Sequence, residues 1–189
     1  MSAAVRGELF IVSGPSGSGK SSLCDALLKQ SPNLSLSISC TTREPRPGEE
    51  DGREYHFLSK TSFEAQRDDG AFLEWANVHG NLYGTRKSDV ETALEEGRDI
   101  LLEIDWQGAA QVAEPLPQAH RIFILPPSVE ALRQRLTARG QDGDTVINRR
   151  VAAAESEMEH AGEAHYRIVN DQFDDALKQL QSLYNNNHS

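Results

Sequence analysis

The stretch Gly14-Pro-Ser-Gly-Ser-Gly19-Lys20-Ser21 decides the fold of this 189-residue chain. It matches the pattern G-x-x-x-x-G-K-[ST], in which glycines let successive main-chain N–H groups turn toward phosphate oxygens. An apolar stretch, 8–13, precedes it, and a helical pattern, 20–30, follows it and adds the positive end of a helix dipole. The sequence therefore predicts a phosphate-binding loop for a nucleoside triphosphate, in which Lys20 reaches the β- and γ-phosphates and Ser21 binds Mg²⁺. The residues expected to bind the triphosphate are Gly14, Pro15, Ser16, Gly17, Ser18, Gly19, Lys20, Ser21 and Ser22.

The composition is that of a globular, acidic chain. Hydrophobic residues make up 38% and charged residues 25%, and 29 acidic against 19 basic residues give a formal net charge of -10. We expect no nucleic-acid partner, because contacts to a phosphate backbone need a basic face. No stretch approaches the ~20 apolar residues of a membrane span, and the first residues lack the pattern of a secretory leader. Two cysteines, Cys24 and Cys40, are too few for a disulfide framework, so we expect reduced thiols and a cytoplasmic location.

Short apolar stretches alternate with helical patterns over most of the chain. Its length allows one domain, or one core that carries insertions. Strand and helix in alternation are typical of a parallel sheet that helices cover on both faces. We therefore predict an α/β fold of the P-loop type, with three layers (α/β/α) around a central parallel sheet. The predicted strands are 8–13, 99–105, 121–125 and 166–169, and the predicted helices are 20–30, 88–96, 128–140, 145–160 and 173–184.

The region 36–86 breaks this alternation, because its apolar stretches are short and its Pro and Gly residues are frequent. Strands over 72–78 and 82–85 are predicted to form a hairpin around His79-Gly80-Asn81, and a short helix is expected before them. We therefore predict a small mixed or antiparallel subdomain inserted into the core. An arginine-rich helix–loop–helix, 131–151, is predicted to close over the triphosphate as a lid, with a solvent-facing charged surface as the alternative. The core then comprises 1–35, 87–130 and 152–189.

Two groups of polar residues outside the phosphate loop are candidates for further chemistry. Glu103 and Asp105 end a predicted core strand, where a carboxylate either supports Mg²⁺ or stabilises the following loop, and the sequence favours neither. Arg43 and Arg46 flank a stiff turn in the insertion, and arginine forks suit a phosphate monoester. A hydrolase needs only water beside the triphosphate, whereas a kinase needs such an acceptor site. Solvated surface charges are the alternative for these two arginines.

Six stretches, in their order and spacing, resemble the guanylate kinase family over nearly the whole chain, from about Gly7 to Leu180. The most specific is the run T-T-R-x-P-R-x-G-E, because the phosphate loop is shared by many families. The resemblance implies a P-loop nucleoside monophosphate kinase with a core, a GMP-binding insertion (36–86) and a lid. Such an enzyme transfers the γ-phosphoryl group of Mg²⁺-bound ATP directly to GMP, and to dGMP, giving ADP and GDP. The stretches are Gly14 to Ser22, Ser39-Cys-Thr-Thr-Arg-Glu-Pro-Arg46-Pro-Gly-Glu49, Asp51-Gly-Arg-Glu-Tyr55, Phe72-Leu-Glu-Trp75, Gly80-Asn-Leu-Tyr-Gly84 and Glu103-Ile-Asp-Trp-Gln-Gly108.

The resemblance also implies roles for individual residues. Guanine offers N1–H and an exocyclic amine to the carboxylate of Glu74, whereas adenine has neither donor on that edge and would leave the carboxylate unpaired. At Glu103, which the family pattern associates with placing guanine or metal, the chain departs from many relatives, which have aspartate there. The implied residues are Ser39, Arg43, Arg46, Glu49, Tyr55, Glu74, Tyr83, Thr85 and Glu103 for GMP; Lys20, Arg46, Arg139 and Arg150 for catalysis; Arg135, Asn170 and Asp171 for ATP; and Ser21, with Asp105 farther from the ion, for Mg²⁺.

Two other functions are compatible with parts of this pattern. The first is a catalytically silent scaffold of the same family, which would bind phosphorylated peptides through Arg43, Arg46 and Tyr55. Such scaffolds have a damaged phosphate loop, whereas the four fixed positions of the motif are intact here. The second is a P-loop kinase of another phosphorylated acceptor. Glu74 and Thr85 favour guanine over that alternative, although specificity is a difference of affinities.

Overall fold

The computed structural model describes residues 5–78 and 80–187. Within this part of the chain, the core is a five-stranded sheet in the order β2-β7-β1-β8-β9. Every neighbouring pair in it is parallel, so the predicted central parallel sheet is confirmed. The strands are β1 (Leu9–Ser13), β2 (Leu34–Leu36), β7 (Asp99–Glu103), β8 (His120–Leu125) and β9 (Tyr166–Val169).

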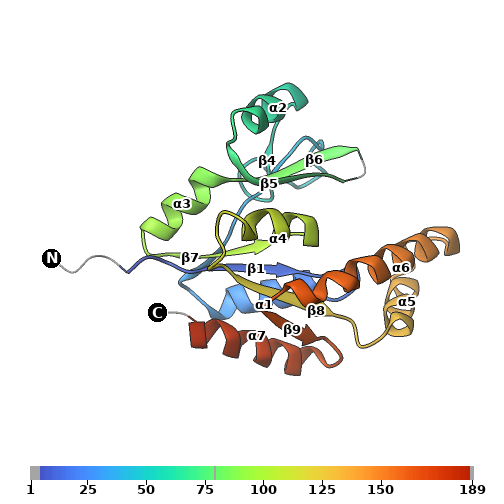
Figure 1. The fold of residues 1–189 in the computed structure, drawn as a ribbon. Helices are drawn as coiled ribbons and strands as arrows, with labels where there is room; N and C mark the ends of the chain where they lie inside the picture. Colours follow the sequence, from blue (N-terminus) through green and yellow to red (C-terminus); the bar gives the residue numbers. More distant parts are fainter. Residues whose placement is uncertain (1–4, 79, 188–189) are drawn as a thin grey trace.

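Helices cover both faces of this sheet, which confirms the three-layer prediction (Figure 1). Successive residues of a strand point to opposite faces, and most residues of the central strands are apolar. In β1, Phe10 and Val12 pack with residues of two helices on one face, whereas Leu9 and Ile11 pack with residues of two others on the opposite face. The first face is covered by α1 (Lys20–Gln30) and α7 (Phe173–Asn187), and the second by α3 (Lys87–Glu95) and α4 (Trp106–Ala113).

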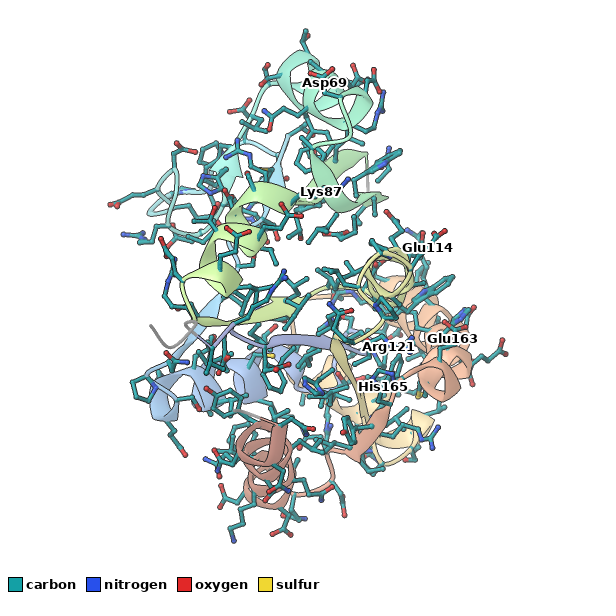
Figure 2. All side chains as sticks on the ribbon, turned by 60° about the vertical axis from the view of Figure 1, so that its left-hand side comes forward. Asp69, Lys87, Glu114, Arg121, Glu163 and His165 are labelled. Atoms are coloured by element: carbon teal, nitrogen blue, oxygen red, sulfur yellow. The ribbon has the colours of Figure 1, made fainter. Side chains whose placement is uncertain are left out.

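A second, smaller sheet lies beyond α4 from the central sheet (Figures 1 and 2). Its strand order is β4-β3-β6-β5, with one parallel and two antiparallel pairings, so the predicted mixed subdomain is confirmed. A small apolar cluster around Phe63 and Phe72 joins it to α2. The predicted hairpin is present, although His79 of its turn lies outside the described residues. The elements are β3 (Cys40–Thr41), β4 (His56–Phe57), α2 (Lys60–Asp68), β5 (Phe72–Val78) and β6 (Asn81–Arg86).

The arginine-rich segment is a pair of helices, α5 (Val129–Ala138) and α6 (Asp144–Met158), as predicted. Ser128 caps α5, because its hydroxyl oxygen accepts from Ala131 N at 3.0 Å. The pair has an apolar cluster of its own, which contains Leu132, Leu136 and Val151. A short 3₁₀ helix, Glu159–Glu163, then leads to β9. There Arg121 Nη2 lies 3.1 Å from His165 Nε2 and ties β8 to the start of β9 (Figure 2).

Several short elements were absent from the sequence-based prediction, among them β2 and α4. The strand β2 has only three residues, and α4 has eight, too few in each case for a clear periodicity. The start of α4 is set by Asp105, whose Oδ1 accepts from Gly108 N at 2.8 Å. Among the described residues, no helix has both the length and the apolar character that crossing a membrane requires.

Candidate active site

The phosphate loop connects β1 to α1 in a shape that requires glycine. Gly14, Gly17 and Gly19 have positive φ angles of 147°, 86° and 85°, which L side chains rarely adopt. The space beside them is also closed. A Cβ at Gly14 would lie 2.4 Å from the Ile124 carbonyl oxygen, and one at Gly19 would lie 2.3 Å from Asn170 Nδ2. The glycines of the motif therefore let the loop pack closely against β8 and the segment after β9.

The end of β7 lies beside this loop. The Ser21 hydroxyl donates a hydrogen bond to a carboxylate oxygen of Glu103, and Lys20 Nζ donates to the Gly14 carbonyl at 3.2 Å. Together the loop and the β7 end line an open cavity of about 430 Å³, which we call the phosphate cavity. Of the residues predicted for ATP, catalysis and Mg²⁺, it brings together Gly14, Pro15, Ser16, Gly17, Gly19, Lys20, Ser21, Ser22, Asp105 and Arg139.

The remaining residues predicted for ATP lie where the loop meets α5 and the segment after β9. The Ser18 side chain is buried, and its carbonyl accepts from Asn170 Nδ2 at 2.8 Å. Arg135 Nη2 donates to the Asn170 carbonyl at 2.7 Å. Arg135, Arg139 and Asp171 line an adjacent cavity of about 450 Å³ with the loop. One continuous surface thus joins the loop, α5 and the segment after β9.

A third cavity, of about 280 Å³, lies between the second sheet and the end of β7, and we call it the acceptor cavity. It shares Val78, Glu103 and Asp105 with the phosphate cavity, so the two cavities meet. A ligand in one is therefore adjacent to a ligand in the other. Of the residues predicted for GMP, Ser39, Tyr55, Glu74, Tyr83 and Glu103 line it.

Glu74 is the buried acid of the acceptor cavity. Its side chain is held by Thr85, whose hydroxyl donates to Glu74 Oε1 at 2.6 Å, and both residues are buried. Burial raises the pKa of Glu74 to about 7, and the hydrogen bond from Thr85 only partly opposes this rise. The nearby charge of Asp105 raises it further. Such a carboxyl gains stability from a ligand that offers N–H donors.

The arginines of the insertion are arranged around Glu49. Arg43 Nη2 lies 3.0 Å from both carboxylate oxygens of Glu49, and Arg46 N donates to the same carboxylate at 2.8 Å. The hydrogen bond from Arg43 holds the pKa of Glu49 below its usual range. The Arg43 guanidinium also lies over the Tyr55 ring, 5.3 Å from its centroid. The Tyr55 ring in turn contacts the Tyr83 ring, with 5.9 Å between centroids. Glu49 therefore fixes Arg43 beside the cavity wall rather than leaving it solvated.

Comparison with known proteins agrees with this architecture. A model of the guanylate kinase family matches residues 6–187. Proteins named guanylate kinase in Cupriavidus metallidurans and Thiobacillus denitrificans are 59% and 56% identical over 94% of this chain, which covers 82% and 85% of theirs. A crystal structure of guanylate kinase from Anaplasma phagocytophilum has a TM-score of 0.77 at 31% identity, covering 96% of this chain and 86% of that one.

This chain belongs to the guanylate kinase family. The resemblance inferred from six stretches of sequence is thus confirmed, and so is the P-loop α/β fold that it implied. The enzyme class, an ATP-dependent nucleoside monophosphate kinase, is confirmed with them. The roles of the individual site residues stay predictions, and the structure gives the positions of these residues.

The arginines predicted for catalysis in this family member lie at different places. Arg139, at the end of α5, lines the phosphate cavity. Arg150, on α6, forms an ion pair with Asp142 of the intervening loop at 2.9 Å and does not line the phosphate cavity. Arg46 is exposed in the turn of the insertion. The structure therefore brings Lys20 and Arg139 together and leaves Arg46 and Arg150 outside the cavity walls.

Two residues of the phosphate cavity escaped the sequence-based reasoning about this family member. Glu157 of α6 and Val78 of β5 both line the phosphate cavity. Burial raises the pKa of Glu157, while the charge of Lys20 lowers it. Neither residue belongs to a motif, and only the packing of α6 and β5 against the loop brings them there. No pattern in the sequence marks them.

Proposed function

We propose that this chain, as a guanylate kinase, transfers the γ-phosphoryl group of ATP directly to GMP, giving ADP and GDP, with dGMP as a second acceptor. One observation carries the proposal: the phosphate cavity and the acceptor cavity meet at Val78, Glu103 and Asp105. A donor and an acceptor seated in them face each other. Positioning of this kind converts a bimolecular reaction into a nearly unimolecular one.

The acceptor cavity suits guanine at the end where Glu74 lies. A buried carboxylate needs hydrogen-bond donors, and guanine offers N1–H and its exocyclic amine. Thr85 already donates to Oε1 of Glu74, and Ser39 lines the same cavity. Adenine offers no donor on that edge, so it would leave the carboxylate buried and unpaired. This mismatch is the physical basis that we assign to base selection.

The phosphate of GMP would lie toward Arg43, with Tyr55 and Tyr83 supplying hydroxyl donors. Arg43 is already oriented by Glu49, so less side-chain entropy is lost when a phosphate binds. Arg46 lies on the same turn and is free to move with it, because its side chain is exposed. We assign Glu49 the role of holding this turn, and Arg43 and Arg46 the role of binding the phosphate.

On the donor side, Lys20 and the loop N–H groups would hold the β- and γ-phosphates. The side-chain oxygen atoms of Ser21 and Glu103 are metal ligands of the type that Mg²⁺ prefers, and Asp105 lines the same cavity. Among the described residues no group of three or more His, Cys, Asp and Glu side chains is arranged to hold a metal, which fits an ion whose coordination the triphosphate completes. When bound, Mg²⁺ would neutralise charge on the transferred group.

The transfer needs no covalent enzyme intermediate, because an oxygen of the GMP phosphate is itself the nucleophile. Lys20 and Arg139 would stabilise the charge that develops on the transferred group. The segment 131–151 would act as the lid, bringing Arg150 toward the phosphates, and 36–86 would act as the GMP-binding insertion on the core of 1–35, 87–130 and 152–189. Closure of both would exclude water and limit hydrolysis of ATP.

Two broader expectations accompany this proposal. The partners are ATP and GMP, without nucleic acid, because a net charge of -10 disfavours a phosphate backbone, whereas a nucleotide needs only local positive charge such as Lys20 and Arg139 in the phosphate cavity. The buried thiols of Cys24 and Cys40 are free, which suits the reducing cytoplasm. Burial raises the pKa of Cys40 to about 11 and that of Cys24 still further, so neither is a reactive thiolate.

A coupled assay of ADP release, with Mg-ATP and a panel of GMP, dGMP, AMP, CMP and UMP, tests the proposal. We expect turnover with GMP and dGMP and little with the other three. A catalytically silent scaffold would give no turnover with any acceptor. A kinase of another acceptor would turn over AMP, CMP or UMP at least as well as GMP.

A further inference from the structure

The helix α4 joins the core to the edge of the second sheet. The strand β5 is the last strand in the order β4-β3-β6-β5, so one row of its main-chain groups faces away from β6. Figure 2 shows α4, whose end Glu114 marks, between the central sheet and the second sheet. The contact between α4 and β5 therefore determines how the second sheet sits on the core.

Gln111 of α4 binds this free edge through both atoms of its side-chain amide. Gln111 Oε1 accepts from Trp75 N at 3.0 Å, and Gln111 Nε2 donates to the Trp75 carbonyl at 3.0 Å. One side chain thus replaces the pair of hydrogen bonds that a neighbouring strand would exchange with Trp75. The bidentate contact fixes both the position and the direction of the strand at this residue.

The residue before Trp75 is Glu74, the buried acid of the acceptor cavity. Its other carboxylate oxygen, Oε2, packs against α4, since a Cβ built on Gly108 would lie 2.8 Å from it. Gly108 and Gln111 are three residues apart and share one face of α4. Thr85 holds Oε1 from the other side at 2.6 Å. The main chain at Trp75 and the side chain of Glu74 are thus positioned by the same helix.

We propose that Gln111 is a positioning residue for recognition of the guanine base, acting through the main chain of Trp75 on the carboxylate of Glu74. The inference rests on the proposed role of Glu74. It adds that base selection depends on a hydrogen-bonded junction between the core and the insertion. Gln111 itself does not line the acceptor cavity, so its effect on GMP is transmitted through β5.

If Gln111 had a purely structural role, its loss would lower the global stability of the protein rather than the affinity for GMP. Both hydrogen bonds lie at an exposed position, the residues on either side of Trp75 are paired with β6, and the Arg67 guanidinium lies 5.1 Å from the Trp75 ring centroid. Exposed bonds of this kind add little to global stability. Their loss would instead let β5 shift by a fraction of an ångström, and recognition of a base is sensitive to such shifts.

The test uses Gln111→Met, which keeps the length of the side chain and removes both hydrogen bonds. We expect the KM for GMP at pH 8 to rise about ten-fold, with the KM for ATP changed less than about two-fold and kcat changed less than the KM for GMP. Gln179→Met is the matched control, because Gln179 is an exposed glutamine on α7, far in sequence from the junction. Equal effects on GMP and ATP, or no effect on either, would overturn the proposal.

A second readout follows Glu74 without GMP. Titration of ¹³C-labelled glutamate side chains by NMR, assigned with Glu74→Gln, should show the Glu74 pKa below about 7 in Gln111→Met, because the carboxyl gains water. Asp105 is the charged neighbour in both proteins, so its contribution stays in the comparison. An unchanged Glu74 pKa, with Glu74→Gln still impairing GMP turnover, would overturn this inference alone. A Glu74→Gln variant with unimpaired GMP turnover would overturn the guanine assignment and this inference with it.

Discussion

At the scale of single residues, the site depends on a carboxyl in an unfavourable environment. Glu74 is only 5% exposed, and within the described part of the chain its carboxyl has one side-chain hydrogen bond, from Thr85. An ionised carboxylate in such surroundings is destabilised unless further donors reach it. The fold therefore holds the Glu74 carboxyl where a ligand with hydrogen-bond donors would stabilise its ionised form. Residues of this kind couple ligand identity to affinity.

The ionisation of Glu74 predicts a pH dependence. Its pKa of about 7 means that the free enzyme holds mostly the neutral carboxyl at pH 6 and mostly the carboxylate at pH 8. Guanine N–H donors need the carboxylate, so GMP affinity should rise by about ten-fold between these pH values. Direct calorimetric binding of GMP measures this. Because the GMP phosphate also titrates near pH 6, Glu74→Gln serves as the control, and the same pH profile in both proteins would contradict the assignment.

Lys20 offers a second test at this scale. Its ammonium already contacts the Gly14 carbonyl at the mouth of the loop, where the β- and γ-phosphates are expected. Lys20→Ala should lower kcat by about 10²- to 10⁴-fold, because a charge aimed at the transferred group is lost. Far-UV circular dichroism and the Tm should stay near the wild-type values. Near-normal turnover in the variant would refute the account of the phosphate loop.

At the scale of elements, some helices and strands could be predicted from the local sequence pattern, whereas others depend on tertiary packing. The helix α1, the hairpin strand β5 and the strand β9 lie at their predicted bounds, because each has a clear period or a clear stop. The helix α4 was missed, since it is short and its start is capped by Asp105, a residue whose role the sequence left open between metal and loop. The structure adds a capping role for Asp105 without removing it from the phosphate cavity.

The candidate site shows the same division. Residues in motifs, such as Arg43 and Glu74, could be named because whole runs of sequence resemble one family. Glu157 and Gln111 could not, because each acts alone and meets its partners only through packing of α6 or α4. Positions that depend on how two elements pack leave no local pattern in a single sequence. Arg150 shows the converse, since the resemblance implied a catalytic role for it, whereas the structure pairs it with Asp142 outside the phosphate cavity.

The close approach of α4 to Glu74 predicts that a side chain added to α4 impairs function more than stability. Gly108→Ala adds a Cβ 2.8 Å from Glu74 Oε2, so the KM for GMP should rise about ten-fold or more as the carboxylate is displaced. Alanine stabilises a helix by about 1 kcal/mol relative to glycine, which partly offsets the effect of the strain on the Tm. Gly162→Ala is the control, since nothing lies within 4 Å of its Cβ. A Gly108→Ala enzyme with wild-type KM would contradict the packing argument.

At the scale of the whole molecule, a chain with a net charge of -10 places a few of its cations at two cavities that meet, and carboxylates line both cavities as well. Lys20 and Arg139 face the phosphate cavity, and Arg43 borders the acceptor side. The core supplies the phosphate loop, the second sheet supplies the buried acid, and the helix pair supplies an arginine. The core, the second sheet and the helix pair each have an apolar cluster of their own. The reaction therefore depends on how these three parts are held together.

The ratio of kcat/KM for GMP to that for AMP, in the wild type and in Glu74→Gln, tests this account most directly. Both are measured at pH 8 with saturating Mg-ATP. We predict a wild-type preference for GMP of at least about 10³-fold, because AMP leaves a buried carboxylate unpaired, and a loss of most of that preference in Glu74→Gln. Comparable values for the two acceptors in the wild type, or an unchanged ratio in the variant, would contradict it.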